Sequence, residues 1–180
     1  MDSPAFRNWP PSGKRSKTAF TKAVPRAAFC DAVDPRQVAA ALGDEPLEAQ
    51  SYDNGEEVTL ADGVTDVAHE FGCTWARADQ SEARAWVFAP PVSADRAREL
   101  VEAAGRSKDC QASATPAYGS PSVGLLCTGE AGGRASYQGL FGDAWLTCQV
   151  ASQDPEVSGA ELLRRTGAWC VGVAMAASAD

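Results

Sequence analysis

Six cysteines spread along the chain constrain this sequence more than any other feature. No two of them form a Cys-x-x-Cys pair, and the 180 residues include a single histidine, His69; the cysteines are Cys30, Cys73, Cys110, Cys127, Cys148 and Cys170. Zinc sites and thioredoxin-like sites need closely spaced ligands or thiols, so the spacing disfavours both. An even number of separated cysteines predicts three disulfides and an oxidising compartment. Six free thiols in a cytosolic protein are the alternative.

The N-terminal residues bear on the same question of compartment. Residues 1–17 lack the apolar stretch of a signal peptide, which taken alone predicts a cytoplasmic protein. No run of about 18 apolar residues that could span a membrane occurs either. Because the cysteines argue for oxidation, we predict an extracytoplasmic domain, anchored to the cell membrane or secreted. Its leader or anchor is then missing from this sequence.

Charge is divided unevenly along the chain. The formal net charge is −8, but six basic residues precede Cys30 against the single acid Asp2, so residues 31–180 carry −13. This acidic body argues against nucleic acid as a partner, because phosphate binding needs clustered Lys and Arg. We interpret the basic, Pro- and Ser-rich residues 1–27 as a linker or stalk. The alternative is a juxtamembrane segment that contacts an anionic membrane surface. Residues 28–180 then form a single domain.

Local patterns predict three helices and six strands. Asp34, Ser93 and Ser158 are N-cap candidates, each followed by apolar residues at helical spacing, and Gln37 and Glu161 complete capping boxes. The polar stretch after the first helix is predicted to be a loop. Alternating or apolar segments predict strands at 56–60, 69–77, 83–89, 122–129, 133–142 and 144–152.

The element order predicts an α+β fold. An antiparallel sheet would be built from two β-β-β-α units after an extra N-terminal helix, with the helices packed on one face of the sheet. The expected core aromatics are Trp75, Trp86, Phe88, Phe141, Trp145 and Trp169.

The six cysteines allow fifteen pairings, and the element order narrows them. If the two halves correspond, a cysteine before each half would bond the cysteine in a "CT" strand motif, and the last two would pin the final helix to the sheet. The expected disulfides are therefore Cys30–Cys73, Cys110–Cys127 and Cys148–Cys170.

Two short motifs carry a resemblance to a known family. "FCDAVDPRQVAAALG" followed by "GCTW" resembles the actinobacterial secreted lipoproteins grouped as domain of unknown function 3558. Over about residues 28–177 the layout is also similar to the extracellular sensor domains of mycobacterial receptor Ser/Thr kinases, which are disulfide-bonded α+β domains with a groove. The resemblance implies a disulfide-bonded envelope protein with no catalytic residues to transfer. A third cysteine pair and the lack of a lipobox cysteine depart from these families.

Catalytic motifs are missing from the sequence. A Ser-His-Asp or Cys-His group would have to use His69, and no Gly-rich phosphate loop or nucleophile elbow occurs. We predict no enzyme, cofactor or metal, but a domain that binds an envelope or membrane protein, a cell-wall fragment or a small ligand. The alternative is a secreted hydrolase acting through paired carboxylates, such as Glu56 with Glu57 or Asp66 with Glu70.

One loop is a candidate binding rim. The segment "TPAYGSPSVG", residues 115–124, combines two prolines and two glycines with an aromatic residue. Its candidate binding residues are Tyr118, Ser120 and Ser122. The alternative is a plain connector.

Overall fold

Seven strands form one antiparallel sheet in the computed structural model, which describes residues 22–59, 64–113, 118–129 and 132–178. Their order across the sheet is β1-β4-β5-β9-β8-β7-β6. A separate two-stranded sheet pairs β2 with β3. The strands are β1 (Glu48–Tyr52), β2 (Glu57–Thr59), β3 (Thr65–Val67), β4 (Glu70–Ala76), β5 (Glu82–Phe88), β6 (Cys110–Ser113), β7 (Ser122–Gly129), β8 (Gly132–Phe141) and β9 (Ala144–Ser152).

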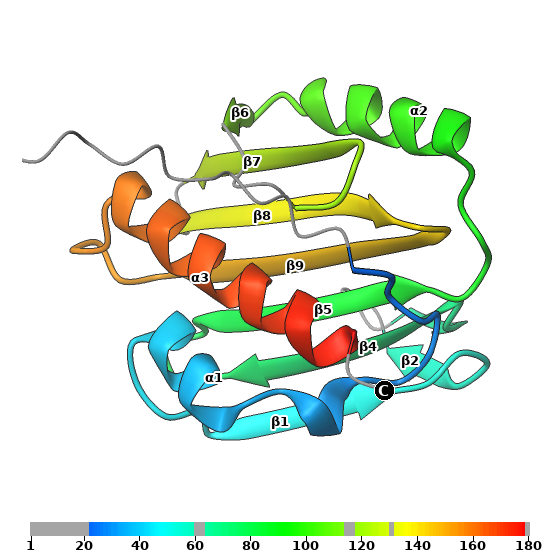
Figure 1. Cartoon of the computed structure of the whole chain (residues 1–180). Coiled ribbons are helices and arrows are strands. Elements are labelled where there is room, and N and C mark those ends of the chain that lie inside the picture. The colour runs from blue at the N-terminus through cyan, green and yellow to red at the C-terminus, as the bar shows by residue number, and fades with distance from the viewer. Residues whose placement is uncertain (1–21, 60–63, 114–117, 130–131, 179–180) are drawn as a thin grey trace, which may run out of the picture.

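The helices lie on both faces of the seven-stranded sheet (Figure 1). The helices are η1 (Cys30–Ala32), a 3-10 turn, and the α-helices α1 (Pro35–Leu42), α2 (Ala94–Gly105) and α3 (Gly159–Ala177). Helices α1 and α3 cover one face, which we call the helix face. The opposite face, which we call the open face, is covered by α2 only at the end formed by β6, β7 and β8.

Each α-helix begins at the cap that the sequence predicts. The Asp34 side chain accepts a hydrogen bond from the Arg36 amide, Ser93 from Arg96, and Ser158 from Glu161. Gly43 ends α1 with φ of +84°, a conformation that costs glycine little. The capping box predicted at Gln37 is not formed among the described residues. The Gln37 side chain instead packs against Gly172 of α3, in the space that a Cβ at Gly172 would fill, so α1 and α3 lie close together.

Acid is expected to weaken the first turn of α3. Two arginines, Arg164 and Arg165, donate hydrogen bonds of 2.7 to 2.8 Å to the Glu161 carboxylate and lower its pKa from 4.5 to about 2. A carboxyl with a lower pKa in the folded state stabilises the fold above its unfolded pKa, and this contribution disappears as the pH falls from 4.5 towards 2. Glu161→Gln should therefore flatten the pH dependence of the unfolding free energy over this range.

Urea denaturation at stepped pH measures this effect. The matched control is Glu156→Gln, because Glu156 is exposed in the turn before α3 and forms no ion pair with a described residue. An unchanged pH dependence in Glu161→Gln would contradict the assignment. Because the pairs are partly exposed, added salt should reduce the difference between the two variants.

The main core lies on the helix face, between the sheet and α3. Trp169 is 1 % exposed and its ring meets the ring of Trp75 edge-on, with centroids 5.4 Å apart. The Trp169 indole N–H donates to the Arg84 carbonyl oxygen at 3.2 Å, so the helix contacts the backbone of the inner strand β5. A smaller cluster around Trp145 lies under α2 on the open face. Trp86 is half-buried outside the core clusters.

All three expected disulfides are present; two lie on the helix face of the sheet and one lies on the open face. Cys30–Cys73 ties η1 to β4, and Cys148–Cys170 ties β9 to α3; both join the core of the helix face. Cys110–Cys127 joins the directly paired strands β6 and β7 on the open face, below α2. The expected layout with all helices on one face is therefore wrong. The cause is that Leu100 and Val101 of α2 pack on Trp145 and its neighbours, whose side chains point away from α3.

Strand assignments near the N-terminus also differ from expectation. Residues 48–52, which the sequence predicts to be loop, form the edge strand β1, and the predicted strand at 56–60 pairs with β3 outside the main sheet. Exposure explains both differences, because these strands bury too little apolar surface to leave a clear alternating pattern.

Part of the predicted stalk packs on the domain. Within residues 22–27, Val24 is 3 % exposed and belongs to the core, and Arg26 pairs with Asp143 at 3.2 Å. The Lys22 ammonium donates to the Ser178 carbonyl oxygen at 3.4 Å. The predicted stalk 1–27 otherwise lies outside the described residues and stays a prediction.

Candidate functional site

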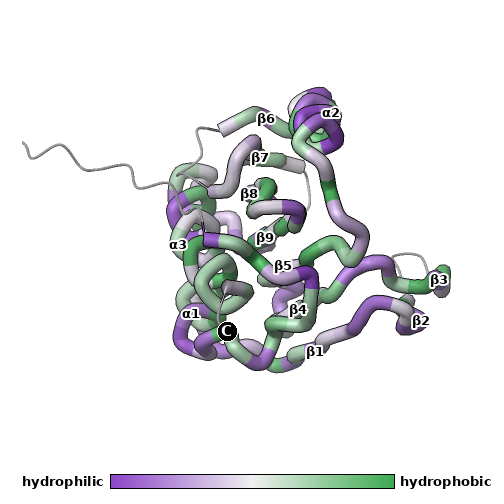
Figure 2. Tube along the Cα trace, turned by 45° about the vertical axis from the view of Figure 1, so that its right-hand side comes forward, coloured by the Kyte–Doolittle hydropathy of each residue, from purple (hydrophilic) through white to green (hydrophobic). Residues whose placement is uncertain are grey.

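A pocket lies on the open face, between the main sheet and the small sheet formed by β2 and β3. Figure 2 shows the small sheet projecting from the same side as α2, away from α1 and α3. The floor comes from β1, β4 and β5, and the wall from residues 56–59 and 66–69. Its volume is about 860 Å³, which is within the usual range of small-molecule and peptide pockets.

Strand alternation decides which side chains reach the floor. Gln50, Thr74 and Arg84 are paired across β1, β4 and β5, so their side chains share the open face. The neighbouring row begins with Tyr52, which pairs with Gly72. A Cβ at Gly72 would stand 2.4 Å from the Tyr52 ring, so the glycine in "FGCTW" leaves the space that this ring occupies.

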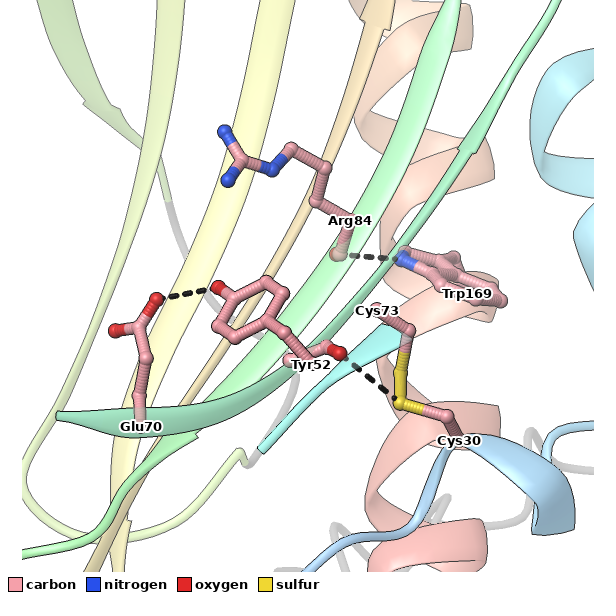
Figure 3. The surroundings of a disulfide bond; sticks show 7 residues. Cys30, Tyr52, Glu70, Cys73, Arg84 and Trp169 are labelled. Carbon is pink, nitrogen blue, oxygen red and sulfur yellow. Dashed lines mark hydrogen bonds between the residues drawn. A yellow bond between two sulfur atoms is a disulfide. The ribbon is translucent and has the colours of Figure 1, made fainter. Parts of the chain in front are cut away.

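A tyrosine–glutamate pair is built into the floor (Figure 3). The Tyr52 hydroxyl donates to the Glu70 carboxylate at 2.5 Å, and the two side chains point toward one another on the open face. Burial, together with the hydrogen bond to Glu70, raises the pKa of the Tyr52 phenol well above its usual value. The phenol therefore stays protonated and remains a donor at neutral pH. The Cys30–Cys73 disulfide and Trp169 lie behind this floor, on the other side of the strands.

Arg84 is the single formal cation among the described residues that line the pocket. Its guanidinium lies 5.5 Å from the centroid of the Trp86 ring and 3.6 Å from the Glu82 carboxylate. The backbone of Arg84 is fixed from the other face, because its carbonyl oxygen accepts the Trp169 hydrogen bond. The arginine is thus held on an inner strand by contacts on both faces of the sheet.

The pocket is strongly acidic. Its lining includes Arg84, His69 and five carboxylates, and the carboxylates belong to Glu56, Glu57, Asp66, Glu70 and Glu82. One cation against five anions leaves a negative cavity, which attracts ligands carrying ammonium or guanidinium groups. The lining also contains amide, hydroxyl and phenol groups that can bond a polar ligand.

The two chain segments of the wall are joined to each other by backbone hydrogen bonds beyond the β2–β3 pairing. The Gly55 amide donates to the Ala68 carbonyl, and the Ala68 amide donates to the Glu56 carbonyl, both at 2.8 Å. The Glu56 side chain also accepts from the Asp53 amide at 3.1 Å. These contacts extend the β2–β3 pairing to the positions just after β1 and just before β4.

The carboxylates that the sequence offered for hydrolysis come together here. Glu56, Glu57, Asp66 and Glu70 all line the pocket, and so does the exposed His69. The Glu70 carboxylate accepts the hydrogen bond from the Tyr52 hydroxyl. Among the described residues, no group of three or more His, Cys, Asp or Glu side chains is arranged to hold a metal ion.

The candidate rim residues lie elsewhere. Tyr118 is 1 % exposed in the core, with its ring centroid 5.0 Å from that of Phe141. Ser120 is exposed and its amide bonds the Leu140 carbonyl, while Ser122 is half-buried at the start of β7. None of the three lines the pocket on β1, β4 and β5. Their role in binding stays a prediction, and residues 115–117 of this loop are outside the described part of the chain.

Sequence reasoning missed the floor of the pocket. Gln50 and Tyr52 fell within a predicted loop, and Thr74 and Arg84 stood in predicted strands with no sign of what they face. The one available signal was Gly72, since a glycine inside a strand often marks the close approach of another group.

Comparisons with known proteins identify a similar solved structure and no family. No protein-family model matches this chain, so membership in domain of unknown function 3558 is not confirmed, and no curated protein matches it. The crystal structure of the extracellular domain of PknH from Mycobacterium tuberculosis is similar, with a TM-score of 0.46 and 11 % identity. The match covers 82 % of this chain and 96 % of that domain. A likeness at this level says nothing about ligand or activity.

Proposed function

We propose that the protein is an extracytoplasmic, non-catalytic binding or sensor domain whose ligand site is the acidic pocket between β1, β4, β5 and the β2–β3 sheet. The observation that supports this most is the pocket itself, a cavity of about 860 Å³ whose described lining has five carboxylates and a single formal cation. The ligand is a molecule or protein segment of the cell envelope that presents cationic groups.

The disulfides support the location. Three cysteine pairs are joined, and no cysteine is left free. Such bonds persist in oxidising compartments and are rare in reducing ones. No α-helix in the described part of the chain has both the length and the apolar character needed to cross a bilayer. An anchor, and any contact of residues 1–27 with a membrane surface, belongs to the proposal.

A blocked pocket tests the binding role. Thr74 lies at the centre of the floor, between Gln50 and Arg84, so Thr74→Trp should fill the cavity. Thr128→Trp is the matched control, because Thr128 is exposed on β7 outside the pocket. Spermidine, a lysine-rich heptapeptide and amine-bearing muropeptides would be titrated against all three proteins while thermal unfolding is followed.

We expect one or more of these compounds to raise the melting temperature of the wild type and of Thr128→Trp, but not of Thr74→Trp. Stabilisation that survives Thr74→Trp, or no stabilisation by any cationic compound, would contradict the proposal. Mass spectrometry of the bound compound after incubation separates the alternatives, because hydrolysis products would favour a hydrolase that uses the pocket carboxylates.

A further inference from the structure

The strand that borders the pocket is an open edge of the sheet. β1 pairs with β4 along one side only, and no hydrogen bond between described residues occupies its other side. Residues 48–51 are all exposed. An edge strand in this state presents a row of unpaired N–H and C=O groups that can pair with another extended chain. The opposite edge strand, β6, has only four residues.

The two side-chain rows of β1 differ in chemistry. The row on the open face holds Glu48, Gln50 and Tyr52, the last two of which line the acidic pocket. The other row holds Ala49 and Ser51, and by alternation Leu47 just before the strand; Leu47 is 73 % exposed. A chain added beside β1 would therefore meet acidic and polar groups on one face, and the apolar Leu47 and Ala49 with the small Ser51 on the other.

We propose that β1 is a docking edge for an extended peptide whose side chains alternate between basic and apolar residues. The peptide adds as a further strand, with its basic row beside Glu48 and the pocket and its apolar row beside Leu47 and Ala49. Neighbouring strands lie about 4.8 Å apart, so the basic side chains are long enough to reach the pocket mouth. This inference rests on the proposed binding function and names the partner of the same site.

The probe is a fluorescein-labelled heptapeptide of alternating lysine and valine, titrated by fluorescence anisotropy. We expect it to bind, and the same peptide with glutamate in place of each lysine not to bind at the same concentrations. Two further versions carry N-methyl groups on either all lysine amides or all valine amides. Alternate amides of a strand point to the same edge, so one version should lose binding and the other should keep it. Equal binding of both would overturn strand addition.

A charge reversal on the protein tests whether the lysine peptide binds beside β1. Glu48→Lys should weaken binding of the lysine peptide about tenfold, because it turns an attraction at the edge into a repulsion. Glu102→Lys makes the same charge change on α2, which packs on β6, β7 and β8 at the other edge, and should weaken binding less than about twofold. Equal losses would show attraction to the whole acidic surface and overturn the proposal.

Failure of this inference is distinguishable from failure of the binding function. If Thr74→Trp removes stabilisation by spermidine or a muropeptide while the lysine peptide shows no edge-dependent binding, strand addition is overturned and the pocket remains a ligand site. If neither the pocket compounds nor the peptide bind the wild type, both proposals are overturned.

Discussion

Replacing Trp169 with alanine is expected to lower the free energy of unfolding by about 4 kcal/mol, the usual cost of truncating a buried tryptophan. The residue is 1 % exposed, and its ring meets Trp75 edge-on. Its indole N–H also holds the carbonyl oxygen of Arg84 on the strand that carries the pocket floor. The change removes packing between α3 and the sheet together with that hydrogen bond.

Urea denaturation followed by circular dichroism measures the loss. Trp169→Phe is the informative control, because it keeps most of the ring packing but leaves the Arg84 carbonyl oxygen without this donor, at a cost of about 1 to 2 kcal/mol. An alanine variant that loses less than the phenylalanine variant would contradict this account of the core.

Removing the Cys148–Cys170 disulfide should cost about as much. Both cysteines are fully buried, and the bond closes a loop of 22 residues between β9 and α3. Loop-closure entropy gives about 3 kcal/mol for a loop of this length, and loss of the buried sulfur contacts adds to it. We expect the double variant Cys148→Ala/Cys170→Ala to show this loss in urea unfolding under non-reducing conditions.

The second bridge provides the comparison. Cys110–Cys127 closes a loop of similar length, 17 residues, but it lies at the sheet edge with Cys110 half-buried. Its removal should cost less than removal of Cys148–Cys170, since few core contacts are lost with it. Equal costs would mean that loop entropy alone accounts for both bridges.

The sequence predicted the three disulfide pairs correctly, although one assumption behind that prediction, the correspondence of the two halves, was wrong. Element order placed Cys73 and Cys127 in corresponding strands and predicted the right partners. The structure puts the two bonds on opposite faces of the sheet, so the halves do not correspond in space. The pairing succeeds because two of the bonds join cysteines in consecutive elements, β6 with β7 and β9 with α3, and this leaves only Cys30 and Cys73 to pair.

The pocket was the least predictable part. β1 is exposed along most of its length, and β2 and β3 bury little apolar surface. Periodic patterns arise where one face of an element is buried, so exposed strands give almost no pattern to read. The pairing of β1 with β4, and with it the meeting of Tyr52 and Glu70, depends on contacts between residues at least 18 positions apart in the sequence.

What the sequence alone determined was local or covalent: the N-caps at Asp34, Ser93 and Ser158, the strands with a buried face, and the three disulfide pairs. The caps and strands follow from neighbouring side chains, and the disulfide pairs follow from the place of each cysteine in the order of helices and strands. Tertiary structure decided which face each helix covers and which carboxylates share a cavity. Both depend on how strands distant in sequence order themselves across the sheet, and that order is set by the packing of whole faces rather than by any local pattern.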